Sequence, residues 1–192
     1  MPSLSAFLKS LILLTVFAFI GGGLFIYSGF YPIGADTPHN SITYLALETL
    51  RERSVARAAK NIEVPTDLDS SDRLLAGGPD YNDMCVGCHL KPGKLESDFT
   101  IGLYPAPPNL NFPEDEHAHS HGPSDSNTNA IKRQFWIIKH GIKASGMPAW
   151  GPTHSDERIW NMVAFLQRLP TLSKDQYQIL TARGDIEGTH EH

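Results

Sequence analysis

The sequence predicts an all-α protein in which one N-terminal membrane-spanning helix precedes a small helical domain. No charged residue occurs between Lys9 and Asp36, and a helix needs only about 20 apolar residues to cross a bilayer. Beyond this stretch, segments rich in helix-forming residues alternate with loops rich in proline and glycine. Together these observations favour a single-pass helical protein.

The composition limits the kinds of partner. The 192 residues suit one compact domain with extensions. The net charge of −5 provides no general attraction for nucleic acid or for an anionic membrane surface. The two cysteines lie three positions apart and are too few for a disulfide scaffold, so they indicate a local chemical motif.

Residues 10–31 form the predicted transmembrane anchor, and residues 1–9 form a short cytoplasmic N-terminus. Tyr27, Phe30 and Tyr31 gather at the far end, where aromatic rings favour the membrane interface. The alternative is a cleaved signal peptide, whose apolar core has about 7–15 residues and ends at a small-residue cleavage site. The apolar run here is longer and lacks an Ala-x-Ala pattern, which favours a retained anchor.

Residues 32–71 are predicted to form a helical stalk and a linker. Within them, residues 41–62 are rich in Ala, Leu, Glu and Arg, lack Gly and Pro, and end before Pro65. The second half of this helix is highly charged and has little apolar surface, so it is a poor candidate for the core of a small domain. A solvated stalk and a docking element for a partner subunit both remain open.

Residues 72–170 form the domain that carries chemistry, and residues 171–192 follow as a polar C-terminal tail with one further candidate helix. A short helix is predicted just before the cysteines, with Pro79 near its start or at a kink. A second is predicted over residues 130–142 from its apolar spacing. A third is predicted from about Asp156 to Leu169, with Ser155 as its N-cap. Residues 90–129 have the composition of a loop. A loop of this length suits a compact domain only where a large flat cofactor replaces part of the core.

The strongest chemical signal is Cys85-Val86-Gly87-Cys88-His89. Two thiols three positions apart on one helical turn can add to the vinyl groups of one porphyrin, and the adjacent His89 can coordinate its iron. A redox Cys-x-x-Cys pair is disfavoured because no β-α-β pattern surrounds the motif. A zinc site is disfavoured because no second pair of ligands stands at zinc-finger spacing. The motif therefore predicts one covalently bound haem c.

The iron needs a sixth ligand or an open position, and Met147 is the candidate ligand. It lies in Gly146-Met147-Pro148, a loop outside any apolar stripe, and coordination by thioether and imidazole produces an electron-transfer haem of raised potential. The alternative for any methionine is core filling. That alternative suits Met162 inside the last helix, and Met84 stands too close to the attachment site to coordinate the iron. The predicted iron ligands are thus His89 and Met147.

Over residues 72–170, about half of the chain, the sequence resembles the class I cytochrome c family. The resemblance lies in Gly77-x3-Tyr81-x3-Cys85-x-x-Cys88-His89, in a Pro-Pro-Asn-Leu segment over residues 107–110, in Gly146-Met147-Pro148-Ala149-Trp150 and in a C-terminal helix with a tryptophan. It implies a helical domain wrapped around one haem c. The long middle loop and the helix over residues 41–62 depart from the family pattern.

The resemblance also implies roles for further residues. The terminal helices of the family cross near the haem, which makes Tyr81 and Trp160 candidates for that contact. A proline carbonyl typically accepts a hydrogen bond from the proximal imidazole; by position Pro108 is the choice and Pro107 the rival. Tyr81, Pro108 and Trp150 are accordingly expected beside the haem, although Trp150 also suits ordinary aromatic packing.

The anchored architecture resembles cytochrome c subunits of bacterial respiratory complexes. The resemblance implies a single-pass protein of the inner membrane, with its haem domain in the periplasm, that carries electrons to or within such a complex. No small-molecule substrate and no nucleic acid is expected, and the chain is expected to be an electron carrier, not an enzyme. A haem enzyme or gas-binding sensor with an open sixth position remains the alternative.

Two clusters of residues admit more than one interpretation. Lys132, Arg133, Lys139 and Lys143 would form either a basic rim that steers an acidic redox partner or a solvated helix face. The histidines at positions 117, 119, 121, 190 and 192 stand in short His-rich tracts. Such tracts sometimes bind metal, but a solvated segment is the favoured interpretation here.

Overall fold

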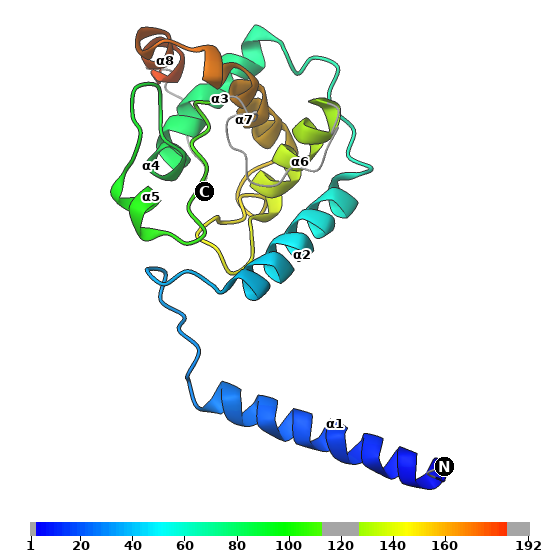
Figure 1. Cartoon of the computed structure of the whole chain (residues 1–192). Helices are drawn as coiled ribbons and strands as arrows, with labels where there is room; N and C mark the ends of the chain where they lie inside the picture. Colours follow the sequence, from blue (N-terminus) through cyan, green and yellow to red (C-terminus); the bar gives the residue numbers. More distant parts are fainter. Residues whose placement is uncertain (1–2, 113–126, 184–192) are drawn as a thin grey trace. The chain divides into compact units, whose positions relative to one another are not determined.

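The computed structural model describes residues 3–112 and 127–183, and these contain helices and loops without a β-strand (Figure 1). The chain divides into two units, residues 1–37 and 38–192. The first unit contains α1 (Leu4–Tyr27), which is capped by Ser3 and buries none of its residues. With 24 residues and a mean hydropathy of 2.2 over an 18-residue window, it is long and apolar enough to cross a membrane. α1 starts earlier than the predicted anchor, because regular helical hydrogen bonding includes the polar residues around Lys9. It also stops earlier, at Tyr27 and not at residue 31.

The second unit opens with α2 (Ser41–Ala59), capped by the Asn40 side chain. This helix packs against α6 (Asn127–His140), as Figure 1 shows. Val55 and Ala59, four residues apart, are buried in that contact, with 3% and 2% of their surface exposed. Over its second half α2 is therefore part of the folded domain, which differs from the solvated stalk that the sequence left open.

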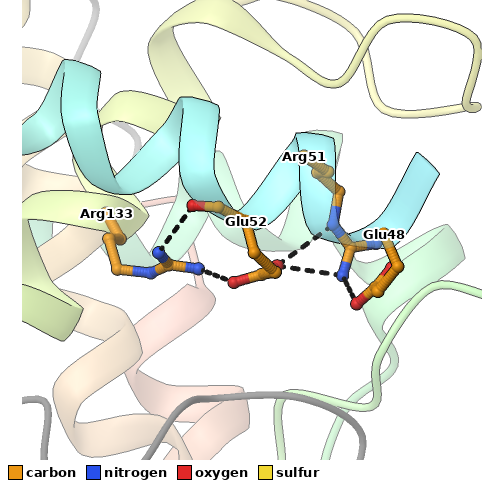
Figure 2. A network of polar contacts seen from close by, with 4 residues as sticks. All are labelled: Glu48, Arg51, Glu52 and Arg133. Atoms are coloured by element: carbon orange, nitrogen blue, oxygen red, sulfur yellow. Dashed lines mark hydrogen bonds and ion pairs between the residues drawn. The ribbon is translucent and has the colours of Figure 1, made fainter. Parts of the chain in front are cut away.

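A polar network fastens the same two helices (Figure 2). The Arg133 guanidinium on α6 donates to the Glu52 carboxylate and, at 3.4 Å, to the Glu52 backbone carbonyl. Arg51 bridges Glu52 and Glu48, with Nη2–Oε1 distances of 3.0 Å and 2.5 Å. Arg133 is buried and Glu52 is half-buried, so the contact between them is shielded from water more than an exposed ion pair is.

The centre of the domain is the crossing of α3 (Ser71–Met84) and α7 (Asp156–Arg168). A Cβ atom on Gly77 would lie 2.0 Å from the Asn161 carbonyl oxygen, so the helix backbones approach as closely as they do because this residue lacks a side chain. Pro79 lies inside α3, after its first two turns. The predicted N-cap of α7 is confirmed, since the Ser155 side chain accepts from Arg158 N.

The remaining helices complete the domain. They are α4 (Val86–His89), α5 (Asp98–Gly102), η2 (Leu169–Thr171) and α8 (Lys174–Thr181). α8 packs against α3 and buries Tyr177, so this part of residues 171–192 differs from the predicted polar tail.

The buried apolar side chains form two clusters. One contains Phe135, Ile138, Trp160, Met162 and Val163 on α6 and α7. The other contains Tyr81 on α3, Phe165 on α7, Leu169 on η2 and Tyr177 on α8. Met162 has only 1% of its surface exposed, so its interpretation as a core residue is confirmed.

Candidate haem site

The two cysteines lie on one helical turn at the junction of α3 and α4. Cys85 closes α3 and opens α4, and its carbonyl oxygen accepts from Cys88 N at 3.1 Å and from His89 N at 2.8 Å. Both thiols are free. The turn therefore presents two thiols and an imidazole together, as double attachment to one porphyrin requires.

The ring of His89 is oriented by a backbone carbonyl. Its Nδ1 atom lies 2.9 Å from the Pro108 carbonyl oxygen. Since a carbonyl only accepts, Nδ1 carries the hydrogen and Nε2 keeps the lone pair that a metal needs. Pro108, and not Pro107, makes this contact. Burial lowers the pKa of His89, with the Pro108 hydrogen bond opposing, so the ring stays neutral and able to act as a ligand.

The protonation of Cys85 bears on which chemistry the motif performs. Burial, with a smaller contribution from the Asp80 carboxylate, raises the pKa of the Cys85 thiol to about 12. Disulfide exchange and zinc binding both need a thiolate, which lowered pKa values favour. In this structure Cys85 is therefore a buried thiol and not an activated thiolate, which disfavours disulfide exchange. Zinc is disfavoured on a different ground, because the described residues contain no group of three or more His, Cys, Asp or Glu side chains arranged to hold a metal.

The chain that leaves the motif is held by Tyr81. The Tyr81 hydroxyl donates to the Leu90 carbonyl oxygen at 2.7 Å and lies 3.2 Å from that of His89. Leu90 has a φ of 67°, a conformation that non-glycine residues rarely adopt, and it is buried. Leu110 N donates to the His89 carbonyl at 3.2 Å. These bonds fix the turn that carries His89.

The loop that carries Met147 is also fixed by hydrogen bonds. Met147 N lies 3.1 Å from the Ser145 Oγ, and the Met147 carbonyl accepts from Ile142 N at 3.2 Å. Gly141 begins the loop with a φ of 65°, and a Cβ there would lie 2.7 Å from the Met147 carbonyl oxygen. Met147 is half-buried and packs at the edge of the cluster around Phe135 and Trp160.

The middle loop connects the two halves of the candidate site. Near one end, Pro108 contacts His89. Five residues earlier, the Leu103 side chain lies so close to Gly146 that a Cβ there would be 2.8 Å from Leu103 Cδ2. One short segment therefore contacts both the His89 turn and the Met147 loop.

A family model matches the domain that carries these residues. The family model described as cytochrome C oxidase, cbb3-type, subunit III matches residues 72–166, about half of the chain. This domain is a c-type cytochrome. The cytochrome domain binds haem c and transfers electrons. No curated protein and no solved structure matches the chain.

The cytochrome domain places its aromatic residues differently from the prediction. Tyr81 packs on Phe165 of α7, with ring centroids 5.3 Å apart. Trp160 instead stacks on Phe135 of α6 at 4.1 Å. The two belong to separate clusters, so Phe165, and not Trp160, is the α7 partner of Tyr81. Phe165 lies five positions after Trp160, more than one turn along α7, which the spacing alone did not distinguish.

Trp150 folds back onto α6. Its backbone N donates to the Ile138 carbonyl at 3.1 Å, and its ring meets the edge of His154 at 5.4 Å. It packs against the same cluster as Met147, which accords with ordinary aromatic packing. Its contact with haem stays a prediction.

The predicted basic rim is only partly available as free charge. Arg133 is buried against Glu52, and Lys139 Nζ lies 2.6 Å from Asp156 Oδ1. Lys132 donates to the Lys60 carbonyl at 3.3 Å. Ion pairing weakens the contribution of Arg133 and Lys139 to a field that would steer a partner. Lys132 keeps its charge, because the carbonyl that it contacts is neutral, and Lys143 is exposed; a steering role for these two residues stays a prediction. The ion-pair partners of Arg133 and Lys139 lie too far away in sequence to be foreseen.

The histidines at positions 117, 119, 121, 190 and 192 lie outside the described residues. Among residues 3–112 and 127–183, no group of three or more His, Cys, Asp or Glu side chains is arranged to hold a metal ion.

An open pocket of about 390 Å³ lies between α2, α6 and α7. Its lining includes Phe135, Trp136 and Trp160. The predicted haem residues Cys85, Cys88, His89 and Met147 do not line it.

Proposed function

We propose that the chain is a membrane-anchored monohaem cytochrome c. Cys85 and Cys88 would attach the haem covalently, His89 and Met147 would ligate its iron, and α1 would hold the domain on the periplasmic side of the inner membrane. Its role would be to relay electrons to or within a respiratory complex.

The hydrogen bond between His89 and Pro108 is the observation that carries the proposal. A neutral imidazole whose Nδ1 is fixed by a carbonyl at 2.9 Å presents Nε2 to a metal in one orientation. Two free thiols stand on the same turn. This set fits haem c, and in the part of the chain that the structure describes no group of three or more His, Cys, Asp or Glu side chains stands ready to hold zinc.

The second ligand is supported by how the Met147 loop is built. The backbone at Met147 is held by two hydrogen bonds, from Ile142 N to the Met147 carbonyl and from Met147 N to Ser145 Oγ. Of the other described methionines, Met162 is buried in the core and Met84 precedes Cys85 directly. When bound, a haem with thioether and imidazole ligands supplies a one-electron couple of raised potential.

Three features support the anchor and the orientation. α1 is long and apolar enough to span a membrane and buries none of its residues. Covalent haem attachment to such a motif takes place outside the cytoplasm in bacteria, as the family resemblance implies. The matched family is named for a subunit of a respiratory oxidase, which supports a place for this chain in or beside a respiratory complex.

Spectroscopy of the purified chain and of a Met147→Ala variant tests the proposal. The wild type should give a covalent haem signal after denaturation, a six-coordinate low-spin spectrum and the absorption band of a bond between methionine sulfur and ferric iron. Met147→Ala should keep covalent haem but lose this band, bind carbon monoxide in the ferrous state and have a lower potential. Met162→Leu is the matched control and should leave the spectrum unchanged.

Two outcomes would count against the proposal. Carbon monoxide binding to the wild-type ferrous protein would favour the haem enzyme or gas sensor with an open sixth position. An unchanged spectrum in Met147→Ala would refute the assignment of the ligand.

A further inference from the structure

The first half of α2 has an exposed apolar surface with no covering element in the described part of the chain. Ile42, Leu45 and Leu50 have 82%, 66% and 67% of their surface exposed, and Leu47 has 50%. At about 100° per residue, Ile42, Ala46 and Leu50 follow one another along a single face. Leu45 and Leu47 flank this face, each about 100° to one side of it. Four large aliphatic side chains so exposed on ten residues indicate binding to something apolar.

The charged residues of this helix continue the same face. Arg53 and Arg57 fall on the line of Ile42, Ala46 and Leu50 at helical spacing, and both are exposed. Val55 and Ala59 point the opposite way and are buried against α6. The outward face of α2 is thus apolar in its first half and basic in its second half.

The opposite face is fixed to the domain. Arg133 binds both the carboxylate and the backbone carbonyl of Glu52, and α2 packs on α6 (Figure 2). The exposed face therefore cannot turn inward to bury its leucines without breaking these contacts.

The chain also limits how far this face can be from a bilayer. α1 ends at Tyr27 and α2 begins at Ser41. Even fully extended, residues 28–40 span no more than about 45 Å. If α1 crosses the membrane, as the proposed function holds, the first turn of α2 lies within about that distance of the lipid surface and can reach it.

We infer that the outward face of α2 binds the membrane surface. Ile42 and Leu50 enter the boundary between headgroups and acyl chains, with Leu45 and Leu47 at the two flanks. Arg53 and Arg57 lie among anionic headgroups. Because the apolar and basic residues are separated along the helix and not around it, α2 meets the surface at a tilt, with its first turns deepest. The inference rests on the proposed anchor.

The composition of the patch favours lipid over a partner subunit. Its members on the exposed first half are aliphatic, and a fluid acyl layer accommodates such chains without a complementary shape. Charge points to the same occupant, because the exposed Arg53 and Arg57 on this face complement the anionic headgroups of a bilayer. The net charge of −5 belongs to the whole chain and does not describe this face, where the exposed charges are Arg53 and Arg57.

Photo-crosslinking of the full chain tests the inference. The photoreactive residue p-benzoylphenylalanine replaces Leu50 on α2 or, as a matched control, Gln178, an exposed residue on α8. After irradiation in bacterial membranes, intact-mass analysis should find adducts of one phospholipid several-fold more often at position 50 than at position 178. In vesicles of phosphatidylcholine with added phosphatidylglycerol, the changes Arg53→Gln and Arg57→Gln should lower this yield.

The outcomes separate the inference from the proposed function. Carbonate washing reports whether the chain is anchored, and the covalent haem signal reports whether the domain is intact. If both hold and position 50 gives no lipid adduct, or gives adducts to a second polypeptide, the inference about α2 is overturned while the anchor stands. If carbonate releases the chain, the anchor proposal fails and this inference fails with it.

Discussion

The Tyr81 hydroxyl donates a hydrogen bond of 2.7 Å to the carbonyl oxygen of Leu90. Tyr81 lies inside α3, and Leu90 is the first residue after the haem motif. The bond joins the helix before Cys85 to the turn after His89, so the segments on both sides of the motif are held together. A residue first considered for its ring thus acts through its hydroxyl as well.

Replacing Tyr81 by Phe tests the value of that hydroxyl. The buried Leu90 carbonyl would lose its donor, and leaving a buried acceptor unsatisfied costs about 1–3 kcal/mol. We expect a loss in the free energy of unfolding within that range, measured by urea denaturation of the haem-loaded protein. Tyr177→Phe is the control, since its hydroxyl bonds to Asn82 at 3.1 Å in a part-buried position. Equal losses in the two variants would contradict this account.

Gly77→Ala tests the crossing of α3 and α7. The new Cβ would lie 2.0 Å from the Asn161 carbonyl oxygen, so one helix must move. Overpacking of this kind costs about 1–3 kcal/mol or more, which urea denaturation would detect. Gly102→Ala is the matched control, because a Cβ there has no neighbour within 4 Å. If both variants keep wild-type stability, the helices are not in close contact at Gly77.

Removing Arg133 tests whether α2 belongs to the folded domain. Arg133→Gln leaves Glu52 without its interhelical partner, and we expect a loss of about 1–3 kcal/mol in the free energy of unfolding. Arg51→Gln removes contacts within α2 only, which are worth less than about 1 kcal/mol. Limited proteolysis gives a second readout, with faster cleavage inside residues 41–59 expected for Arg133→Gln alone. Similar cleavage of both variants would argue against the attachment.

The environment of His154 predicts a dependence of stability on pH. Desolvation, with help from the charge of Arg158, lowers the pKa of His154 below its ordinary value of 6.5. The unfolded chain then binds the proton more readily, so the stability present above about pH 6.5 falls as the pH drops through and below that value. Urea denaturation from pH 8 to pH 5 should show a smaller decline for His154→Gln than for the wild type. Parallel curves would contradict the prediction.

Part of the fold could be predicted from the sequence because local signals coincide there. In α7 a serine N-cap, two acidic residues in the first turn and an apolar stripe all agree, and its start was predicted to the residue. α5 was missed inside the long loop. Its capping box pairs Ser97 with Thr100, whereas the usual box has Glu or Gln at that position.

Other features depend on contacts that a sequence does not display. Val55 and Ala59 are two small apolar residues among charged neighbours, so the burial of α2 leaves almost no periodic signal. Arg133 looked like a surface charge because Glu52 stands 81 residues away. In the site, the haem motif was predictable from the spacing of Cys85, Cys88 and His89, and the Pro108 contact from the family resemblance. The role of the Tyr81 hydroxyl required the position of Leu90.

The position of Cys85 has a consequence for biogenesis. Its side chain packs against the cluster that contains Phe165, on α7, and Tyr177, on α8. Both helices lie later in the chain than the motif, so they emerge from the ribosome after it. If haem is joined to Cys85, docking of α7 and α8 narrows access to this thiol, which is only partly exposed in the folded domain. Attachment before α7 and α8 dock would therefore meet a more accessible thiol than attachment afterwards.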